Sequence, residues 1–197
     1  FFPLVTGMYF LIPKRAKQLW LLVASYYFYM SWNVQYGCLI LLVTAIGYGG
    51  GLLLAQNKVR QGKRRLAVLT GRVLLWVGIL FFFKYSAFAV QNINELLRAV
   101  GSVRALRVPD LILPVGISFY TFQTIGYLID VWKGKTEAEK SFLRFALFVS
   151  FFPQLVAGPI ERSSSLLAQL REPAEFDYDR VKDGLLLMLW GYFEKMW

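Results

Sequence analysis

Three polar side chains recur along one side of an apolar segment near the middle of the chain. Gln123, Tyr127 and Asp130 are spaced i, i+4 and i+7, which places them on one face of a helix. An amide, a phenol and a carboxylate on such a face can hydrogen-bond a neighbouring helix. They can equally line a water-filled cavity through which a polar substrate passes. The spacing favours neither interpretation over the other.

Four charged residues lie inside apolar segments, where a charge is costly and by default indicates function. They are Arg72, Lys84, Asp130 and Arg144. The three basic residues lie near helix ends, so their long side chains can extend to the membrane surface without any further role. The short side chain of Asp130 cannot, which makes it the most informative of the four.

Proline and glycine interrupt the same region twice. Pro114 and Gly116 begin the segment with the polar residues, and we expect an irregular helix start there. Pro153 lies inside the next apolar segment, where it must kink or divide the helix, and Gly158 and Pro159 follow it. Non-helical backbone at membrane depth is tolerated only where it is buried in protein or lines a cavity. These two interruptions therefore predict that a functional site lies beside them.

The composition limits what other chemistry the chain can support. It has no histidine and one cysteine, Cys38, which removes the commonest general base and excludes a disulfide framework or a cysteine zinc site. Ser118 has no base beside it in the sequence. Asp177 and Asp179 have the D-x-D form found in some metal-dependent glycosyltransferases. Just before a helix that we expect to begin near Arg180, they are more simply explained as a helix cap.

The segments that carry these residues are strongly apolar. The chain is 57% hydrophobic and 17% charged, whereas soluble domains are about 45–50% apolar and about 25% charged. Residues 18–57 contain no charged side chain, and about 20 apolar residues suffice for one helical crossing of a bilayer. The net charge of +10 is separated from these tracts and does not follow a polar face. We therefore expect a lipid bilayer as partner, and no nucleic acid.

We predict an all-α, polytopic integral membrane protein with six to seven transmembrane helices, some of them kinked or re-entrant. The helices are expected over residues 1–13, 18–30, 36–55, 66–90, 111–131, 142–157 and from 184 onward. Gly47 and Gly51 have the small-xxx-small spacing of tightly packed helices. We expect residues 1–197 to form a single domain that is truncated at both ends.

Basic residues in the connections predict which side of the membrane each connection faces. The connections after the first, third and fifth expected helices hold eleven Lys and Arg, against seven in the others. This bias agrees with a cytoplasmic first connection and, if every apolar segment crosses, puts residues 161–183 on the opposite side, but it is decisive only for the early connections. Within this last connection, residues 163–165 are serines followed by Leu166, Leu167 and Leu170, which predicts an N-cap and a short amphipathic helix.

Two long blocks of sequence resemble the signature of a known enzyme family. Residues 113–123 are LPVGISFYTFQ, with YLID at 127–130, and residues 151–160 are FFPQLVAGPI. Both blocks resemble the membrane-bound O-acyltransferase family, and most closely its bacterial branch that O-acetylates alginate. Further similarity at residues 2–4, 20–29 and 189–195 extends the resemblance over essentially the whole chain.

The resemblance implies a multi-pass protein of the cytoplasmic membrane whose helices surround a tunnel. Family members pass an acyl group from a cytoplasmic thioester, such as acetyl-CoA, to a hydroxyl on a polysaccharide or lipid, often with an extracytoplasmic acetyltransferase partner protein. We expect acetyl transfer to an exported cell-surface polysaccharide, with no tightly bound cofactor and no metal. The family's catalytic histidine lies in a later helix, so we expect the catalytic part to be absent from this chain and the chain alone to be inactive.

The resemblance also gives the polar residues and the helix interruptions a role in shaping the tunnel, not in transferring protons. The candidates are Pro114, Gly116, Ser118, Gln123, Tyr127, Asp130, Pro153, Gly158 and Pro159. A flippase or transporter for a lipid-linked or polysaccharide substrate is the alternative function, because it would also need kinked helices and charge within the membrane.

Overall fold

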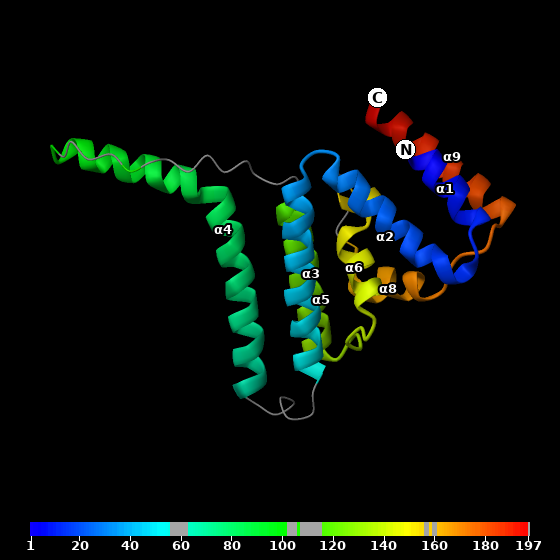
Figure 1. The fold of residues 1–197 in the computed structure, drawn as a ribbon, viewed down its shortest axis with the longest axis horizontal. Helices are drawn as coiled ribbons and strands as arrows, with labels where there is room; N and C mark the ends of the chain where they lie inside the picture. Colours follow the sequence, from blue (N-terminus) through cyan, green and yellow to red (C-terminus); the bar gives the residue numbers. More distant parts are fainter. Residues whose placement is uncertain (56–62, 102–105, 107–115, 156–157, 159–160, 197) are drawn as a thin grey trace.

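A computed structural model describes residues 1–55, 63–101, 106, 116–155, 158 and 161–196, and the secondary structure in these residues is α-helical (Figure 1). The helices are α1 Phe2–Leu11, α2 Lys14–Met30, α3 Val34–Ala55, α4 Lys63–Ala99, α5 Ile117–Lys133, α6 Phe142–Ser150, α7 Phe152–Leu155, α8 Ser163–Arg171 and α9 Tyr178–Met196. The all-α class is confirmed. Two segments, Val34–Ala55 and Leu66–Ala99, are long and apolar enough to cross a membrane. Six to seven crossings remain a prediction.

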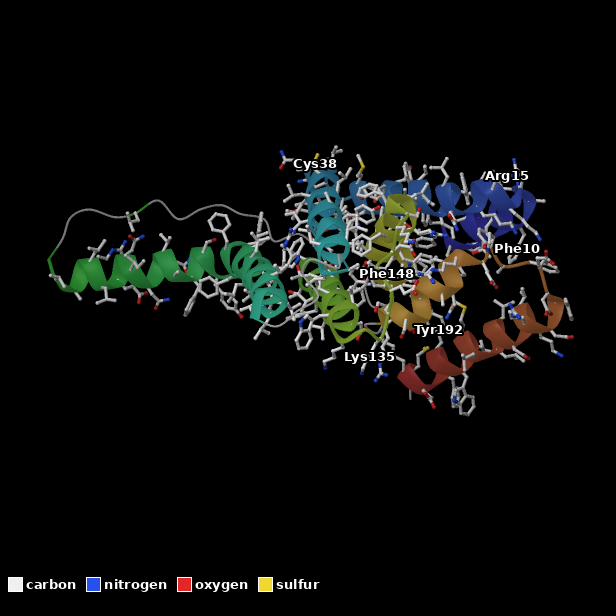
Figure 2. The ribbon with its side chains drawn as sticks, turned by 90° about the horizontal axis from the view of Figure 1, so that it is seen from below. Phe10, Arg15, Cys38, Lys135, Phe148 and Tyr192 are labelled. Atoms are coloured by element: carbon white, nitrogen blue, oxygen red, sulfur yellow. The ribbon has the colours of Figure 1, made fainter. Side chains whose placement is uncertain are left out.

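Helix α5 lies at the centre of the core. It contacts α3, α4, α6 and α8, while α6 also packs against α2 and α3. Aromatic side chains fill the space between these helices: the ring centroids of Tyr127 and Phe145 are 4.8 Å apart, and Trp76 from α4 is fully buried. Figure 2 shows Phe148 of α6 among the helices, while Lys135 lies at the edge of the molecule. The core therefore forms around the helix that carries the polar side chains.

Glycines on α3 allow α5 to approach closely. A Cβ atom on Gly51 would lie only 2.5 Å from the Oη atom of Tyr127, and one on Gly47 only 2.5 Å from the side chain of Thr124. Real Cβ atoms essentially never come this close to other heavy atoms, so neither position accepts a side chain unless the facing side chain on α5 moves. The prediction of tight packing at these two glycines is confirmed.

The helix expected over residues 142–157 is divided. α6 ends at Ser150, Phe151 leaves the helical conformation with φ −56° and ψ 108°, and the one-turn helix α7 contains Pro153. Proline has no N–H to donate to the carbonyl of the residue four positions earlier, so the helix cannot continue through it. The chain turns there as the sequence predicted, and α6 is left with nine residues.

The division of this helix overturns part of the expected topology. At 1.5 Å per residue, the nine residues of α6 span about 14 Å, less than half of a hydrocarbon layer of about 30 Å. The chain instead folds back, and α8 contacts both α5 and α6. The placement of residues 161–183 opposite the first connection is therefore wrong, because the described contacts of residues 163–175 lie at the same end as that connection.

Three hydrogen bonds establish where this returning segment lies. Ser163 Oγ donates to Asp130 Oδ2 at 2.7 Å, near the end of α5, and Lys17 Nζ donates to the carbonyl of Ala174 at 2.8 Å. Gln18 Nε2, also on α2, donates to the carbonyl of Leu170 at 2.8 Å. The start of α2, the end of α5 and helix α8 therefore meet at one end of the molecule, which we call the basic end.

Two helix starts differ from expectation in an informative way. α8 begins at Ser163 and buries Leu166, Leu167 and Leu170, as its amphipathic pattern predicts, but Arg162 occupies the cap position and makes no side-chain cap. Because the hydroxyl of Ser163 donates to Asp130, it joins two helices and caps neither.

Helix α9 begins at Tyr178, two residues before Arg180, where the helix cap predicted a start, and six residues before residue 184, where the apolar crossing was expected. The Oδ1 atom of Asp177 accepts the N–H groups of Asp179 and Arg180 at 3.0 and 3.2 Å. The expected helix-cap role of this aspartate is confirmed.

The close contact between α3 and α5 predicts a position-specific effect on stability. We expect Gly51→Ala to destabilise the protein by about 1–3 kcal/mol, because the new methyl group must displace the buried ring of Tyr127. Gly49→Ala is the matched control, since a Cβ there has no heavy atom within 4 Å and alanine is the better helix former. Thermal unfolding of both variants in detergent tests this, and equal midpoints for the two would contradict the packing argument.

Candidate functional site

Gln123, Tyr127 and Asp130 lie together on α5 and line one cavity of about 260 Å³. The cavity is bounded by α5, by the connection after it and by the start of α8. Its other lining residues are Gly126, Ile129, Lys135, Glu161, Arg162, Ser163 and Ser164. The predicted shared face is confirmed, and the cavity it lines carries two cationic and two anionic side chains at the basic end.

The side chain of Gln123 satisfies a backbone carbonyl that loses its helical partner at the interruption between α6 and α7. In a continuous helix the N–H of Phe152 would donate to the carbonyl of Phe148, four residues earlier. Here that carbonyl accepts the side-chain amide of Gln123 at 3.0 Å, and the N–H of Phe152 donates to Ser25 Oγ of α2 at 3.3 Å. Two side chains from two different helices thus replace one lost backbone hydrogen bond. A buried backbone group left without a partner would cost about 1–3 kcal/mol.

Tyr127 is completely buried and acts as a hydrogen-bond acceptor. Its Oη atom accepts the N–H of Glu139 at 3.0 Å, and its ring packs against Phe145 and Phe148 and beside Gly51. The phenol is therefore held from three sides. Through this hydrogen bond, Tyr127 supports the connection between α5 and α6.

Asp130 joins α5 to α8. Its Oδ2 atom accepts the hydroxyl of Ser163, which is itself buried, while its side chain also borders the cavity. Lys135 and Arg162 line the same cavity from the connections on either side. The stripe on α5 therefore does both things that its pattern allows, since its members bond neighbouring elements and line a polar cavity.

The most heavily bonded charge of this region is one that sequence analysis missed. Glu139 has 1% of its side chain exposed and lies in the connection between α5 and α6. Its carboxylate accepts the N–H of Ser141 at 3.0 Å, Arg144 Nη2 at 2.9 Å and Arg171 Nε at 3.3 Å. Burial alone raises the pKa of Glu139, but the Ser141 hydrogen bond and the two guanidinium groups outweigh it and hold that pKa below its ordinary value.

Glu139 carried no recognisable sequence signal, because it lies in a polar connection and Arg171 is 32 residues away. Arg144 was a candidate for a functional charge or for extension to the membrane surface. It is instead paired with this buried carboxylate. The three side chains join the connection after α5 to the start of α6 and to the end of α8.

Two of the predicted glycines act where backbones meet. Gly116 precedes α5 with φ +77°, and a Cβ atom on it would lie 2.9 Å from the carbonyl oxygen of Leu155 in α7. A Cβ on Gly158 would lie 2.7 Å from the Cα of Gln154. The irregular start of α5 therefore packs directly against the short helix α7.

The remaining candidates lie away from the cavity or outside the described residues. Ser118 is half-buried on α5, and Pro153 is exposed on α7, where it borders an apolar cavity of about 300 Å³ between α1, α2 and α8. Pro114 and Pro159 lie outside the described residues. Arg72 Nη1 donates to the carbonyl of Ile46 on α3 at 3.1 Å. In the described part of the chain, no group of three His, Cys, Asp or Glu residues is placed to hold a metal ion.

The chain is similar in sequence to several known bacterial proteins over most or all of its length. The chain is 37% identical over 197 residues to a probable alginate O-acetylase of Azotobacter vinelandii, covering 100% of the chain and 39% of the relative. It is 32% identical over 219 aligned residues to a peptidoglycan O-acetyltransferase of Helicobacter pylori, covering 95% and 40%.

A teichoic acid D-alanyltransferase of Lacticaseibacillus rhamnosus is 26% identical over 170 residues, which cover 79% of the chain and 37% of the relative. The chain thus spans about two fifths of the length of these curated relatives. No family model and no solved structure matches it.

The buried carboxylate predicts a large and specific loss of stability. We expect Glu139→Ala to destabilise the protein by about 1–3 kcal/mol, because it removes the shared charged partner of Arg144 and Arg171, whose side chains are 29% and 44% exposed and can be partly hydrated. Glu137→Ala, an exposed acid in the same connection, should change the free energy of unfolding by no more than about 0.5 kcal/mol. Denaturant or thermal unfolding in detergent measures both, and a neutral Glu139→Ala would refute the assignment.

The lowered pKa of Glu139 also predicts an acid-dependent loss of stability. Its stabilisation is fully present above the ordinary pKa of 4.5 and is lost as the pH falls through the lower folded-state pKa. Wild-type protein should therefore lose stability below about pH 4.5 more steeply than Glu139→Gln, which has no charge to neutralise. Identical slopes for the two proteins would contradict the prediction.

Proposed function

Because this chain belongs to the membrane-bound O-acyltransferase family, we propose that it forms part of an enzyme that transfers acetyl groups to hydroxyls of an exported cell-surface polysaccharide. The observation that carries the proposal is the identity of 32–37% to O-acetylases of alginate and peptidoglycan, over nearly the whole chain. The polar cavity among apolar helices is consistent with a path for a small acyl donor.

In the proposed reaction, a hydroxyl of the acceptor attacks the carbonyl carbon of an acyl thioester such as acetyl-CoA. The hydroxyl loses its proton to a general base, the C–S bond breaks, and the thiol leaves as the new ester forms. The chain contains no histidine, and no assembled nucleophile or base is found among its described residues. We therefore place the catalytic base outside these 197 residues, and we assign to this chain the positioning of donor and acceptor.

The cavity beside α5 is the part of the chain best suited to such positioning. Its walls combine the amide of Gln123, the carboxylate of Asp130 and the cationic side chains of Lys135 and Arg162. The carboxylate of Asp130 accepts a hydrogen bond from Ser163, and the amide of Gln123 donates one to the carbonyl of Phe148. Both polar groups are therefore held in place before any ligand binds. Groups positioned in advance lose little entropy when they bind.

The revised path of the chain also supports a location in the cytoplasmic membrane with the basic end in the cytoplasm. Once residues 162–175 are counted at the basic end, that end holds thirteen Lys and Arg, against three at the other end. This asymmetry is stronger than the one expected when every apolar segment was assumed to cross. A cytoplasmic thioester would then enter from the basic end, and a partner protein would receive the acyl group at the other.

The proposal predicts that the polar stripe contributes to transfer. We expect Gln123→Leu and Asp130→Leu to lower the rate of acetyl transfer by about ten- to a hundredfold, without loss of membrane insertion, because the walls of the cavity would no longer be held in register. The rate of transfer from a labelled acetyl donor, normalised to inserted protein, measures this. Wild-type rates in both variants would assign the stripe to packing alone.

A matched pair of substitutions separates the charge of Asp130 from its hydrogen bond. Asp130→Asn removes the charge and keeps an oxygen that can accept from Ser163, whereas Ser163→Ala removes the bond and keeps the charge. If the charge acts on a ligand in the cavity, only Asp130→Asn should lower the rate at saturating donor. An equal effect of both variants would show that the link between α5 and α8 matters more.

The absence of a base from this chain predicts that it has no activity by itself. Membranes that contain only residues 1–197 should transfer no label from an acetyl donor to polysaccharide, while membranes that contain a protein of the relatives' full length should do so. Measurable turnover by residues 1–197 would refute the assignment of the base to another part of the enzyme.

A further inference from the structure

Helix α4 changes character halfway along its 37 residues. Residues 66–83 contain one charged side chain, Arg72, whereas residues 84–99 contain Lys84, Glu95 and Arg98 together with several amides. Figure 1 shows the first part standing beside α3 and α5, and the second part turning away from them at the end opposite the basic end. Figure 2 shows the same second part extending sideways from the other helices.

The second part of α4 is strongly amphipathic. At 100° per residue, its large apolar side chains other than Phe88, which lies on the polar side, fall within an arc of about 140°. They are Tyr85, Val90, Ile93, Leu96 and Leu97, with Ala89 among them. The opposite face carries Lys84, Gln91, Asn92, Asn94, Glu95 and Arg98. Apart from Phe88 on the polar side and Ser86 within the apolar arc, the two kinds of side chain are separated, which is typical of a helix that lies between an apolar phase and water.

The described residues cover this apolar face only in part, since Ala89, Val90 and Leu97 are half-buried. Ile93 is 44% exposed and Leu96 is 66% exposed. The polar face has a local partner, because Asn94 donates to the carbonyl of Leu106 at 2.8 Å and accepts the N–H of Leu106 at 2.7 Å. A helix of this length is marginal in water when it stands alone. Some apolar surface must therefore stabilise it.

The length of the first part identifies that surface. Residues 66–83 span about 27 Å at 1.5 Å per residue, close to the hydrocarbon thickness of about 30 Å. If α4 enters the bilayer at the basic end, Lys84 reaches the far boundary just where the sequence becomes amphipathic and the helix turns aside. From this geometry we propose that residues 84–99 lie in the lipid–water interface opposite the basic end, with the apolar face toward the acyl chains.

This inference rests on the membrane location under the proposed function, and it adds a lipid-binding element to it. The occupant of the apolar face is the bilayer surface, because the face continues directly from a membrane-length apolar helix. An interfacial helix at this point fixes the depth of α4, and α4 packs along α5. The polar stripe on α5 is thereby held at a constant depth relative to the headgroups.

Depth-dependent fluorescence quenching tests the proposal in the protein reconstituted in vesicles of phosphatidylcholine and phosphatidylglycerol. Single cysteines replace Ile93 or Leu96 on the apolar face and Gln91 or Glu95 on the polar face, in a Cys38→Ser background, and carry an environment-sensitive fluorophore. We expect nitroxide lipids labelled near the headgroup to quench the two apolar-face probes severalfold more than aqueous iodide does. The reverse order is expected for the two polar-face probes.

Two results would overturn the proposal. Equal iodide quenching of all four probes would show that the helix projects into water. Shielding of the apolar-face probes from both quenchers would show that protein covers them. A probe at Leu74, which is 64% exposed on the first part of α4, separates this inference from the membrane location itself. If deep nitroxide lipids quench Leu74 while the pattern at residues 91–96 is absent, only the interfacial helix is refuted.

Discussion

One missing backbone hydrogen bond determines the arrangement of the second half of the core. The carbonyl of Phe148 and the N–H of Phe152 would join in an unbroken helix, but the turn before Pro153 separates them, and Gln123 and Ser25 satisfy them instead. Since both substitutes come from other helices, the turn can exist only where α2 and α5 lie close by. The interruption and the packing around it are therefore mutually dependent, and the return of the chain toward the basic end follows from it.

The segment that contains α8 is held in place by an ion pair between Arg171 and the buried carboxylate of Glu139. Removing Glu139 from water is unfavourable, and it is offset only because two guanidinium groups and the N–H of Ser141 surround the carboxylate. Arg171 of α8 donates to the carboxylate of Glu139, and the Oη atom of Tyr127 accepts the backbone N–H of Glu139. Tyr127 also lines the polar cavity, so the ionic cluster and the cavity share this side chain.

Local features of this chain could be predicted from the sequence, and distant ones could not. The shared face of Gln123 and Asp130, the small-residue spacing of Gly47 and Gly51 and the cap at Asp177 depend on residues within one or two helical turns, which spacing alone reveals. The topology of residues 161–183 failed because the basic-residue count assumed that each apolar segment crosses a membrane. Glu139 was missed for a related reason, since its partner Arg171 lies 32 residues away and nothing local marks either residue as buried.

The contact between Gly51 and Tyr127 also constrains how this sequence can diverge. Because the phenol occupies the space in which a side chain at position 51 would lie, a larger residue there is compatible with the fold only if position 127 becomes smaller. A smaller residue at 127 would, however, lose the oxygen that accepts the N–H of Glu139. Exchange at position 51 is therefore coupled, through the Oη atom of Tyr127, to the ionic cluster at Glu139, and positions 51 and 127 should vary together in related chains.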